Sequence, residues 1–182
     1  MRLFLWLLLA SMCSHPALGA PFSLKGRDLI SSKDLEMTSG SQGMVLVFLS
    51  SACPCSDSHV EELAKLSQDF PDFPFFAVHS NQDESVENSK PYFIDKKLPF
   101  PVIQDDHAVI ADRYKALKTP HAFVLNPKGD VLYRGGVSDS AHFARSKTKY
   151  LRNALTDLKN QQAVKTPEGR TLGCLISREE NE

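Results

Sequence analysis

The residues of this chain best suited to chemistry are the two cysteines in Cys53-Pro54-Cys55-Ser56. They follow an unbroken apolar run from Met44 to Leu49, and such a short run is typical of a strand buried on both faces. A helix is predicted directly after them, because Ser58 and Glu61 have capping-box spacing. The free N–H groups and the positive end of a helix favour the thiolate, which is the reactive form of cysteine. The pattern therefore predicts that Cys53 lies at a strand-to-helix junction with a pKa below the value of a free thiol.

Cys174, in the last part of the chain, is the candidate for a second thiol. A bridge between Cys53 and Cys55 would close a tight and strained ring, whereas a flexible tail brings Cys174 to Cys53 without strain. Gly173 lets the backbone turn sharply just before this cysteine, and the apolar residues around it predict that the tail docks on the domain. The sequence favours Cys174 as the resolving thiol and leaves Cys55 as the alternative. A packing role for Cys174, or a tether to another chain, also stays open.

The first residues have the pattern of a secretory signal peptide. Arg2 supplies a positive start, Leu3 to Met12 is an apolar run too short to cross a membrane, and Ala17-Leu18-Gly19 offers small residues for cleavage. We expect residues 1–19 to be removed together with Cys13, and the mature protein to be periplasmic or extracellular. Such a compartment is oxidising, so disulfides persist there. Three cysteines then remain, and this odd number favours thiol chemistry over a purely structural disulfide framework.

Composition and charge point to one soluble globular domain. The chain of 182 residues has 21 Lys and Arg against 22 Asp and Glu, a formal net charge of −1, and 42% hydrophobic residues. Nothing here favours a nucleic-acid partner. After the signal peptide we predict a lead-in over residues 20–43, with a short helix around Ser32 to Met37. The main domain follows over residues 44–162, and residues 163–182 form a tail that carries Cys174.

The elements that position these cysteines form an α/β pattern. The segments from Met44 to Leu49 and from Phe75 to His79 are predicted parallel strands joined by a helix, which is a right-handed βαβ unit. Two further strands form a hairpin, which Thr119-Pro120 precedes. All four strands are expected in one sheet. The remaining predictions are an edge segment over 98–103, the hairpin strands at 122–125 and 131–134, and helices from about Val86 and over 107–117 and 147–162.

With these elements placed, the sequence resembles the secreted thioredoxin-like redoxins, the broad family of alkyl hydroperoxide reductase and thiol-specific antioxidant (AhpC/TSA) proteins. The resemblance rests on the Cys53-Pro54-Cys55-Ser56 junction, on the hairpin from Thr119-Pro120 to Gly136, and on Gly173-Cys174-Leu175-Ile176 in the tail. It implies a thioredoxin-like fold, with a central mixed sheet flanked by helices. It also implies a cis Thr119–Pro120 bond that faces Cys53 and offers its backbone to a substrate.

The same resemblance implies roles for the cysteines. Cys53 takes the nucleophilic position, Ser56 stands where the usual resolving cysteine would be, and Cys55 is an addition. The peroxiredoxin signature, Pro-x-x-x-Thr-x-x-Cys, is not matched, because Leu46 stands at the proline position and Ser50 at the threonine position.

Three functions follow as alternatives. The first is an exported thiol–disulfide oxidoreductase without a cofactor, which uses Cys53 with Cys174 or Cys55. Its partners would be protein or small-molecule disulfides and an electron donor that is exported or held in a membrane. The second is a copper carrier that uses Cys53, Cys55 and His121, since soft thiolates favour Cu(I). The third is a thiol peroxidase.

Two polar features are interpreted as solvated surface: the acidic pair Asp83-Glu84 and the helix residue His59. The sequence does not specify the physiological substrate, the direction of electron flow or the oligomeric state.

Overall fold

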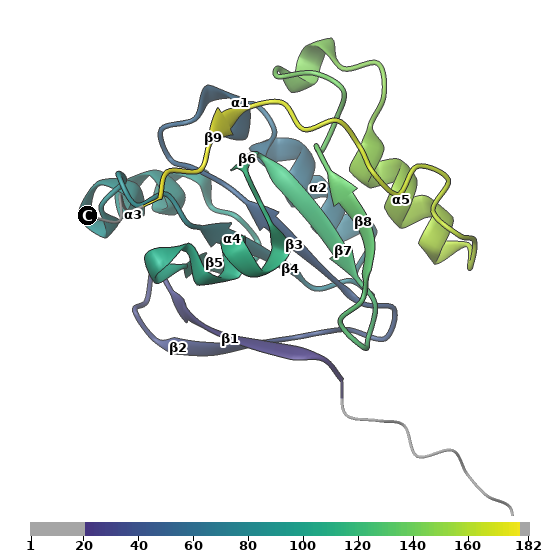
Figure 1. Cartoon of the computed structure of the whole chain (residues 1–182), viewed down its shortest axis with the longest axis horizontal. Coiled ribbons are helices and arrows are strands. Elements are labelled where there is room, and N and C mark those ends of the chain that lie inside the picture. The colour runs from purple at the N-terminus through teal and green to yellow at the C-terminus, as the bar shows by residue number, and fades with distance from the viewer. Residues whose placement is uncertain (1–20, 179–182) are drawn as a thin grey trace, which may run out of the picture.

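The computed structural model describes residues 21–178, so the predicted signal peptide and Cys13 lie outside the described residues. A seven-stranded mixed sheet forms the centre, in the order β2-β1-β5-β4-β3-β7-β8 (Figure 1). Strands β3, β4 and β5 are parallel to one another, whereas β7 runs antiparallel to β3 and β8 antiparallel to β7. The strands are β1 Ser23–Asp28, β2 Asp34–Thr38, β3 Met44–Phe48, β4 Phe75–His79, β5 Val102–Gln104, β7 His121–Leu125 and β8 Val131–Gly135.

Two short strands, β6 Lys118–Thr119 and β9 Cys174–Leu175, make a second small sheet. The helices are α1 Pro54–Asp57, α2 Val60–Asp69, α3 Val86–Lys96, α4 Val109–Tyr114 and α5 Tyr150–Lys159, with 3-10 turns η1 Asp106–Ala108 and η2 Phe143–Arg145. Within residues 21–178, no helix is long and apolar enough to cross a membrane.

The central strand β3 is apolar throughout because both of its faces are covered. Val45 and Val47 pack into a cluster with residues of α2, α3 and α5. Met44, Leu46 and Phe48 pack into a second cluster with residues of α4 and of strand β7. Successive side chains of a strand point to opposite faces of the sheet. A run with no polar residue is therefore the pattern that this three-layer arrangement requires, and the predicted α/β class, with a mixed sheet flanked by helices, is confirmed.

The lead-in contains a β-hairpin where a helix was predicted around Ser32 to Met37. Strand β2 pairs antiparallel with β1, and β1 pairs with β5, so this segment completes the main sheet. In β2 the exposure alternates, and Met37 is its buried residue. The turn before β2 is closed by the Asp28 carboxylate, which accepts a hydrogen bond from the Ser31 N–H. Pairing across the sheet thus decides the structure of this segment, and the helix prediction is wrong.

Three other local predictions need correction. The segment over 98–103 leads to an interior strand, since β5 lies between β4 and β1; its prolines precede the strand and leave the ladder intact. The helix predicted over 107–117 is limited to α4, and Val109 and Leu117 within the predicted range are exposed. His59, not Ser58, occupies the N-cap of α2.

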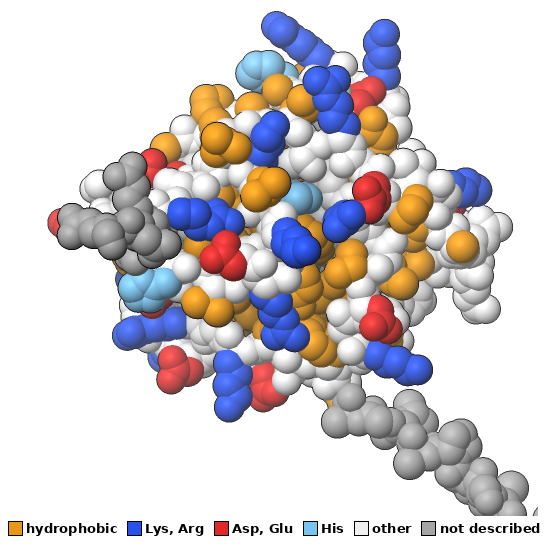
Figure 2. Space-filling view, viewed as in Figure 1, with side chains coloured by type: hydrophobic (Ala, Val, Ile, Leu, Met, Phe, Trp, Pro, Cys, Tyr) orange, Lys and Arg blue, Asp and Glu red, His pale blue; other side chains and the backbone are white. Residues whose placement is uncertain are grey.

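The surface agrees with the balanced composition. On the face shown in Figure 2, basic side chains are scattered among acidic and apolar ones, without a broad patch of one sign.

Candidate functional site

Cys53 lies where β3 leads into α1. It is the N-cap residue of that helix, with extended backbone angles, and Pro54 supplies the first helical residue, a position at which proline's missing N–H costs nothing. The residue is only 2% exposed. Its carbonyl accepts a hydrogen bond from the Asp57 N–H at 3.0 Å. The predicted strand-to-helix junction is therefore confirmed, with a covered sulfur at its centre.

The Thr119–Pro120 peptide bond lies against this sulfur. The bond is cis, as predicted, and the Cys53 thiol donates a hydrogen bond to the Thr119 carbonyl at 3.2 Å. The Thr119 hydroxyl is buried beside this sulfur and favours its thiolate form. Cys53 and the start of the β7 hairpin, far apart in sequence, thus form one site.

The tail brings Cys174 to the same place. Strand β9 pairs antiparallel with β6, with Cys174 opposite Thr119 and Leu175 opposite Lys118. In Figure 1 the yellow tail crosses above the sheet to reach this position. The side chains of Cys174 and Cys53 lie close enough for each to shift the pKa of the other. The predicted docking of the tail is confirmed, and all three cysteines in residues 21–178 are free thiols.

The three thiols differ in acidity because of their surroundings. Burial alone would raise the pKa of Cys53, but hydrogen bonds from Cys174, Thr119 and the Ser56 backbone lower it from 9.0 to about 7. Hydrogen bonding to Cys53, followed by burial, raises the pKa of Cys174 to about 12. Burial and the neighbouring Cys53 raise the pKa of Cys55. These surroundings favour the thiolate at Cys53 and the protonated thiol at Cys174, which is the direction predicted for the pKa of Cys53.

Glu84 holds the residues just before Cys53, and the interpretation of this residue as solvated surface is wrong. Its carboxylate accepts hydrogen bonds from the hydroxyls of Ser50 and Ser51 and, at 2.8 Å, from the Ser51 N–H. The same carboxylate also accepts a hydrogen bond from the Ala52 N–H at 3.3 Å, and it lies 3.2 Å from His79 Nε2. Burial would raise the pKa of Glu84, but the bonds from His79, Ser50 and Ser51 lower it to about 2.

Sequence reasoning missed Glu84 because its partners Ser50, Ser51 and Ala52 lie more than thirty positions earlier in the chain. The only local signal is the pair of serines before Cys53, and it does not identify a partner. Ser50, which stands at the threonine position of the peroxiredoxin signature, donates a hydrogen bond from its hydroxyl to the Glu84 carboxylate.

His59 is also buried, against the prediction of a solvated residue. It is 1% exposed, and its Nδ1 lies 2.7 Å from the Cys55 carbonyl. Its Nε2 lies 2.9 Å from the Ser138 hydroxyl, and burial lowers its pKa. A neutral ring that donates from Nδ1 and accepts at Nε2 satisfies both contacts, and it fixes the backbone at Cys55.

A copper site is not supported by the arrangement of possible ligands. Throughout residues 21–178, no group of three or more His, Cys, Asp or Glu side chains is arranged to hold a metal ion. His121 is buried and stacks on Phe123 with ring centroids 4.5 Å apart. Burial and, less strongly, the charge of Arg134 lower the pKa of His121 to about 4.

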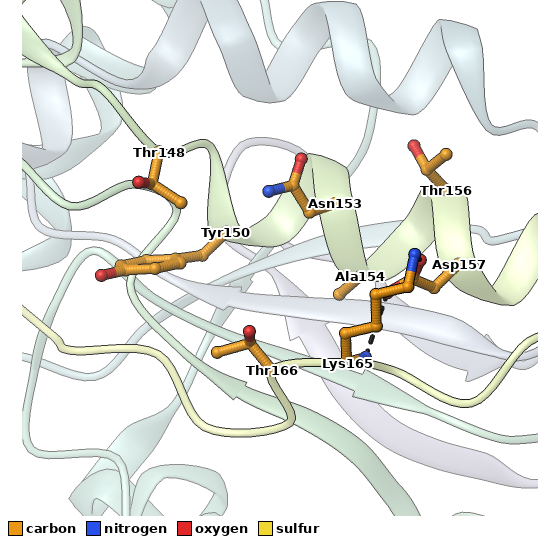
Figure 3. A pocket seen from close by; sticks show the side chains of 8 residues that line it. All are labelled: Thr148, Tyr150, Asn153, Ala154, Thr156, Asp157, Lys165 and Thr166. Carbon is orange, nitrogen blue, oxygen red and sulfur yellow. Dashed lines mark hydrogen bonds and ion pairs between the residues drawn. The ribbon is translucent and has the colours of Figure 1, made fainter.

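The cavity shown in Figure 3 is separate from the thiol site. It has a volume of about 340 Å³, lies along α5, and contains the ion pair between Lys165 and Asp157, 3.2 Å apart. No cysteine lines it.

Fold and site together define a thioredoxin-fold protein with a reactive cysteine at the end of a central strand. Residues 17–134 match the AhpC/TSA family, and the chain belongs to this family.

Individual proteins resemble this chain in sequence or in fold. The sporulation thiol-disulfide oxidoreductase A of Bacillus subtilis is 25% identical over 120 residues, which cover 64% of this chain and 71% of that protein. A conserved protein of Geobacillus kaustophilus superposes with a TM-score of 0.79 at 23% identity, over 90% of this chain and 93% of the other. A secreted disulfide oxidoreductase of Mycobacterium tuberculosis gives a TM-score of 0.50 at 18% identity, over 59% of this chain and 79% of the other.

Proposed function

We propose that this protein is an exported thiol–disulfide oxidoreductase in which Cys53 is the nucleophile and Cys174 the resolving thiol. The observation that carries the proposal is the placement of Cys174 opposite Thr119, where its thiol hydrogen-bonds Cys53. The thiol-disulfide oxidoreductase among its relatives supports the same class of activity. The substrates are protein or small-molecule disulfides.

The chemistry needs only sulfur and protons. The Cys53 thiolate attacks one sulfur of a substrate disulfide, so that a Cys53–substrate disulfide forms and the other substrate sulfur leaves as a thiolate. Cys174 then loses its proton to this thiolate or to water and attacks the Cys53 sulfur. A Cys53–Cys174 disulfide forms, and the second substrate sulfur leaves as a thiolate. An exported or membrane-held dithiol donor reduces the enzyme again; run in reverse, the same steps make the protein an oxidant.

Cys55 fits the resolving role less well. Its carbonyl is held by His59, and also accepts a hydrogen bond from the Ser58 hydroxyl at 3.1 Å. A bridge to Cys53 within this fixed backbone would be strained. Cys174 instead lies on a strand whose pairing with β6 already holds it opposite Thr119, beside Cys53.

The test is to trap the intermediate with single variants of the purified mature protein. Cys174→Ser is expected to accumulate a substrate adduct on Cys53, detected by intact mass and peptide mapping. Cys55→Ser is expected to turn over without trapping, and Cys53→Ser to form no adduct. Trapping by Cys55→Ser, with turnover by Cys174→Ser, would assign the redox centre to the Cys53–Cys55 pair instead.

Export is part of the proposal. We expect the mature chain to begin at residue 20 and to contain the main domain over 44–162 with its tail over 163–182. The N-terminal sequence of the protein recovered from outside the cytoplasm tests this expectation, since a retained Met1 there would contradict it.

A further inference from the structure

The edge of the backbone beside Cys53 is occupied by the chain's own tail. Strand β9 covers β6, and the Ile176 N–H just beyond it donates to the Leu117 carbonyl at 3.0 Å. This is the pairing that an extended peptide makes when it adds a strand to an exposed sheet edge. The tail therefore presents Cys174 to Cys53 in the way that a substrate strand would present its own cysteine.

We propose that this edge binds an extended polypeptide disulfide in place of the tail, and that substrate and tail exchange there during each cycle. The inference rests on the proposed function, and it specifies the substrate class as unfolded or flexible polypeptide segments with a disulfide. In the mixed disulfide the substrate strand pairs with β6. The returning tail then displaces that strand and delivers Cys174 to the Cys53 sulfur, so that resolution and product release occur together.

Tail and substrate cannot occupy the edge at the same time. Gly173 passes so close to Thr119 that a Cβ built on it would lie 1.9 Å from the Thr119 carbonyl oxygen. Cys53 is only 2% exposed while the tail is docked. A polypeptide long enough to pair with β6 must therefore displace the tail first, whereas a compact disulfide needs less of this space.

The tail is held by contacts that permit exchange. Ile176 is its buried anchor, at 6% exposure, and packs in the cluster with Ala116 and Phe123. Leu175 is 71% exposed. The tail also makes polar contacts: Ser177 with Asp83, Arg178 Nε with Asp112 at 2.8 Å, Arg178 Nη2 with the Ala116 carbonyl at 2.9 Å, and the buried Asn81, whose Nδ2 donates to the Leu175 carbonyl at 3.5 Å. Exposed ion pairs such as that of Arg178 with Asp112 contribute little to stability, so Ile176 is the side chain whose removal is expected to loosen the tail most.

The experiment compares two probes that release the same thiopyridone. One is dithiodipyridine, and the other is a short unstructured peptide whose central cysteine carries a pyridyl disulfide. The measured quantity is the ratio of the peptide rate to the small-probe rate with the reduced full-length mature protein. Any change in the acidity of Cys53 affects both rates and cancels in the ratio. We expect Ile176→Ser to raise the ratio about tenfold, because it removes the buried anchor of the competing strand.

Matched variants make the outcome decisive. Leu175→Ser, an equal truncation of the exposed neighbour, is expected to leave the ratio unchanged, and Arg178→Ala to raise it about twofold by removing an ion pair. Arg178→Ala also serves if Ile176→Ser does not fold. Hydrogen exchange of the Leu175 and Ile176 amides reports whether the tail has opened. An unchanged ratio with an opened tail would overturn the exchange, as would an equal effect of Leu175→Ser. Failure of the proposed function is a separate result, namely an adduct in Cys53→Ser or no trapped adduct in Cys174→Ser.

Discussion

The low pKa of Cys53 depends on the docked tail, and removing the Cys174 thiol tests that dependence. The lowering from 9.0 to about 7 corresponds to roughly 3 kcal/mol in favour of the thiolate. Among the interactions that favour the thiolate, the hydrogen bond from Cys174 is the strongest. If Cys174 accounts for about half of this effect, Cys174→Ala raises the pKa of Cys53 to about 8.

The consequence for reactivity changes sign with pH. At pH 7 about half of Cys53 is thiolate in the parent protein and about a tenth in Cys174→Ala, while the higher pKa makes each thiolate about threefold more nucleophilic. The variant is therefore expected to react up to about twofold more slowly at pH 7. Above pH 9, where both proteins are mostly ionised, it is expected to react about threefold faster.

The assay uses Cys55→Ser as the common background, so that in the Cys174→Ala variant Cys53 is the cysteine that reacts. Iodoacetamide alkylation of Cys53 is followed by peptide mass spectrometry across the pH range, and thiolate absorbance gives the same midpoint independently of access to the sulfur. Cys174→Ser is the control, because its hydroxyl still donates a hydrogen bond and should restore part of the lowering. A midpoint that stays at about 7 in Cys174→Ala would refute the assignment of Cys174 as the thiolate's donor.

Two further outcomes follow from single residues. Glu84→Gln is expected to lower the free energy of unfolding by about 1–3 kcal/mol at pH 7, because a half-buried acceptor of several hydrogen bonds loses its charge. Since the pKa of Glu84 is lowered from 4.5 to about 2, the stability it provides is complete above pH 4.5 and is lost as the pH falls through about 2. Denaturant unfolding against pH should therefore show the two proteins converging in acid, and a constant gap would contradict this account. Gly173→Ala is expected to release the tail, because Gly173 has φ +150° and a Cβ would clash with the Thr119 carbonyl. The release is measured as faster proteolysis after residue 170. Unchanged proteolysis would argue against close packing at Gly173.

Much of the fold could be predicted because its central elements carry their burial in their own sequence. Met44 to Leu49 and Phe75 to Val78 are apolar throughout, and β3 lies within the first segment while β4 covers the second together with His79. The cis bond before the β7 hairpin was predicted from family resemblance, as was the docking of Cys174 in part. In each of these cases the information lies in consecutive residues.

The errors arose where distant partners decide the outcome. Residues around Ser32 to Met37 carry a helix-start signal, but they form β2 because β1 offers a paired edge. Glu84 and His59 were taken for surface residues because their neighbours in sequence are polar. Glu84 in fact binds the backbone before Cys53. His59 contacts the Cys55 carbonyl and the Ser138 hydroxyl. The contacts with Ser138 and with the backbone before Cys53 join segments that are far apart in the sequence. No local pattern therefore predicts them.

The position of Ser56 fits the proposal that the second thiol comes from the tail. Ser56 stands where the usual motif has its resolving cysteine, and it is fully buried. Its hydroxyl accepts a hydrogen bond from the Ser50 N–H at 3.3 Å, while its own backbone hydrogen-bonds Cys53 and favours the thiolate there. The helix position that would resolve an intermediate is thus used to fix the junction and to acidify the nucleophile. In the proposed mechanism the resolving thiol comes from another part of the chain, and the strand that pairs with Thr119 holds Cys174 beside Cys53.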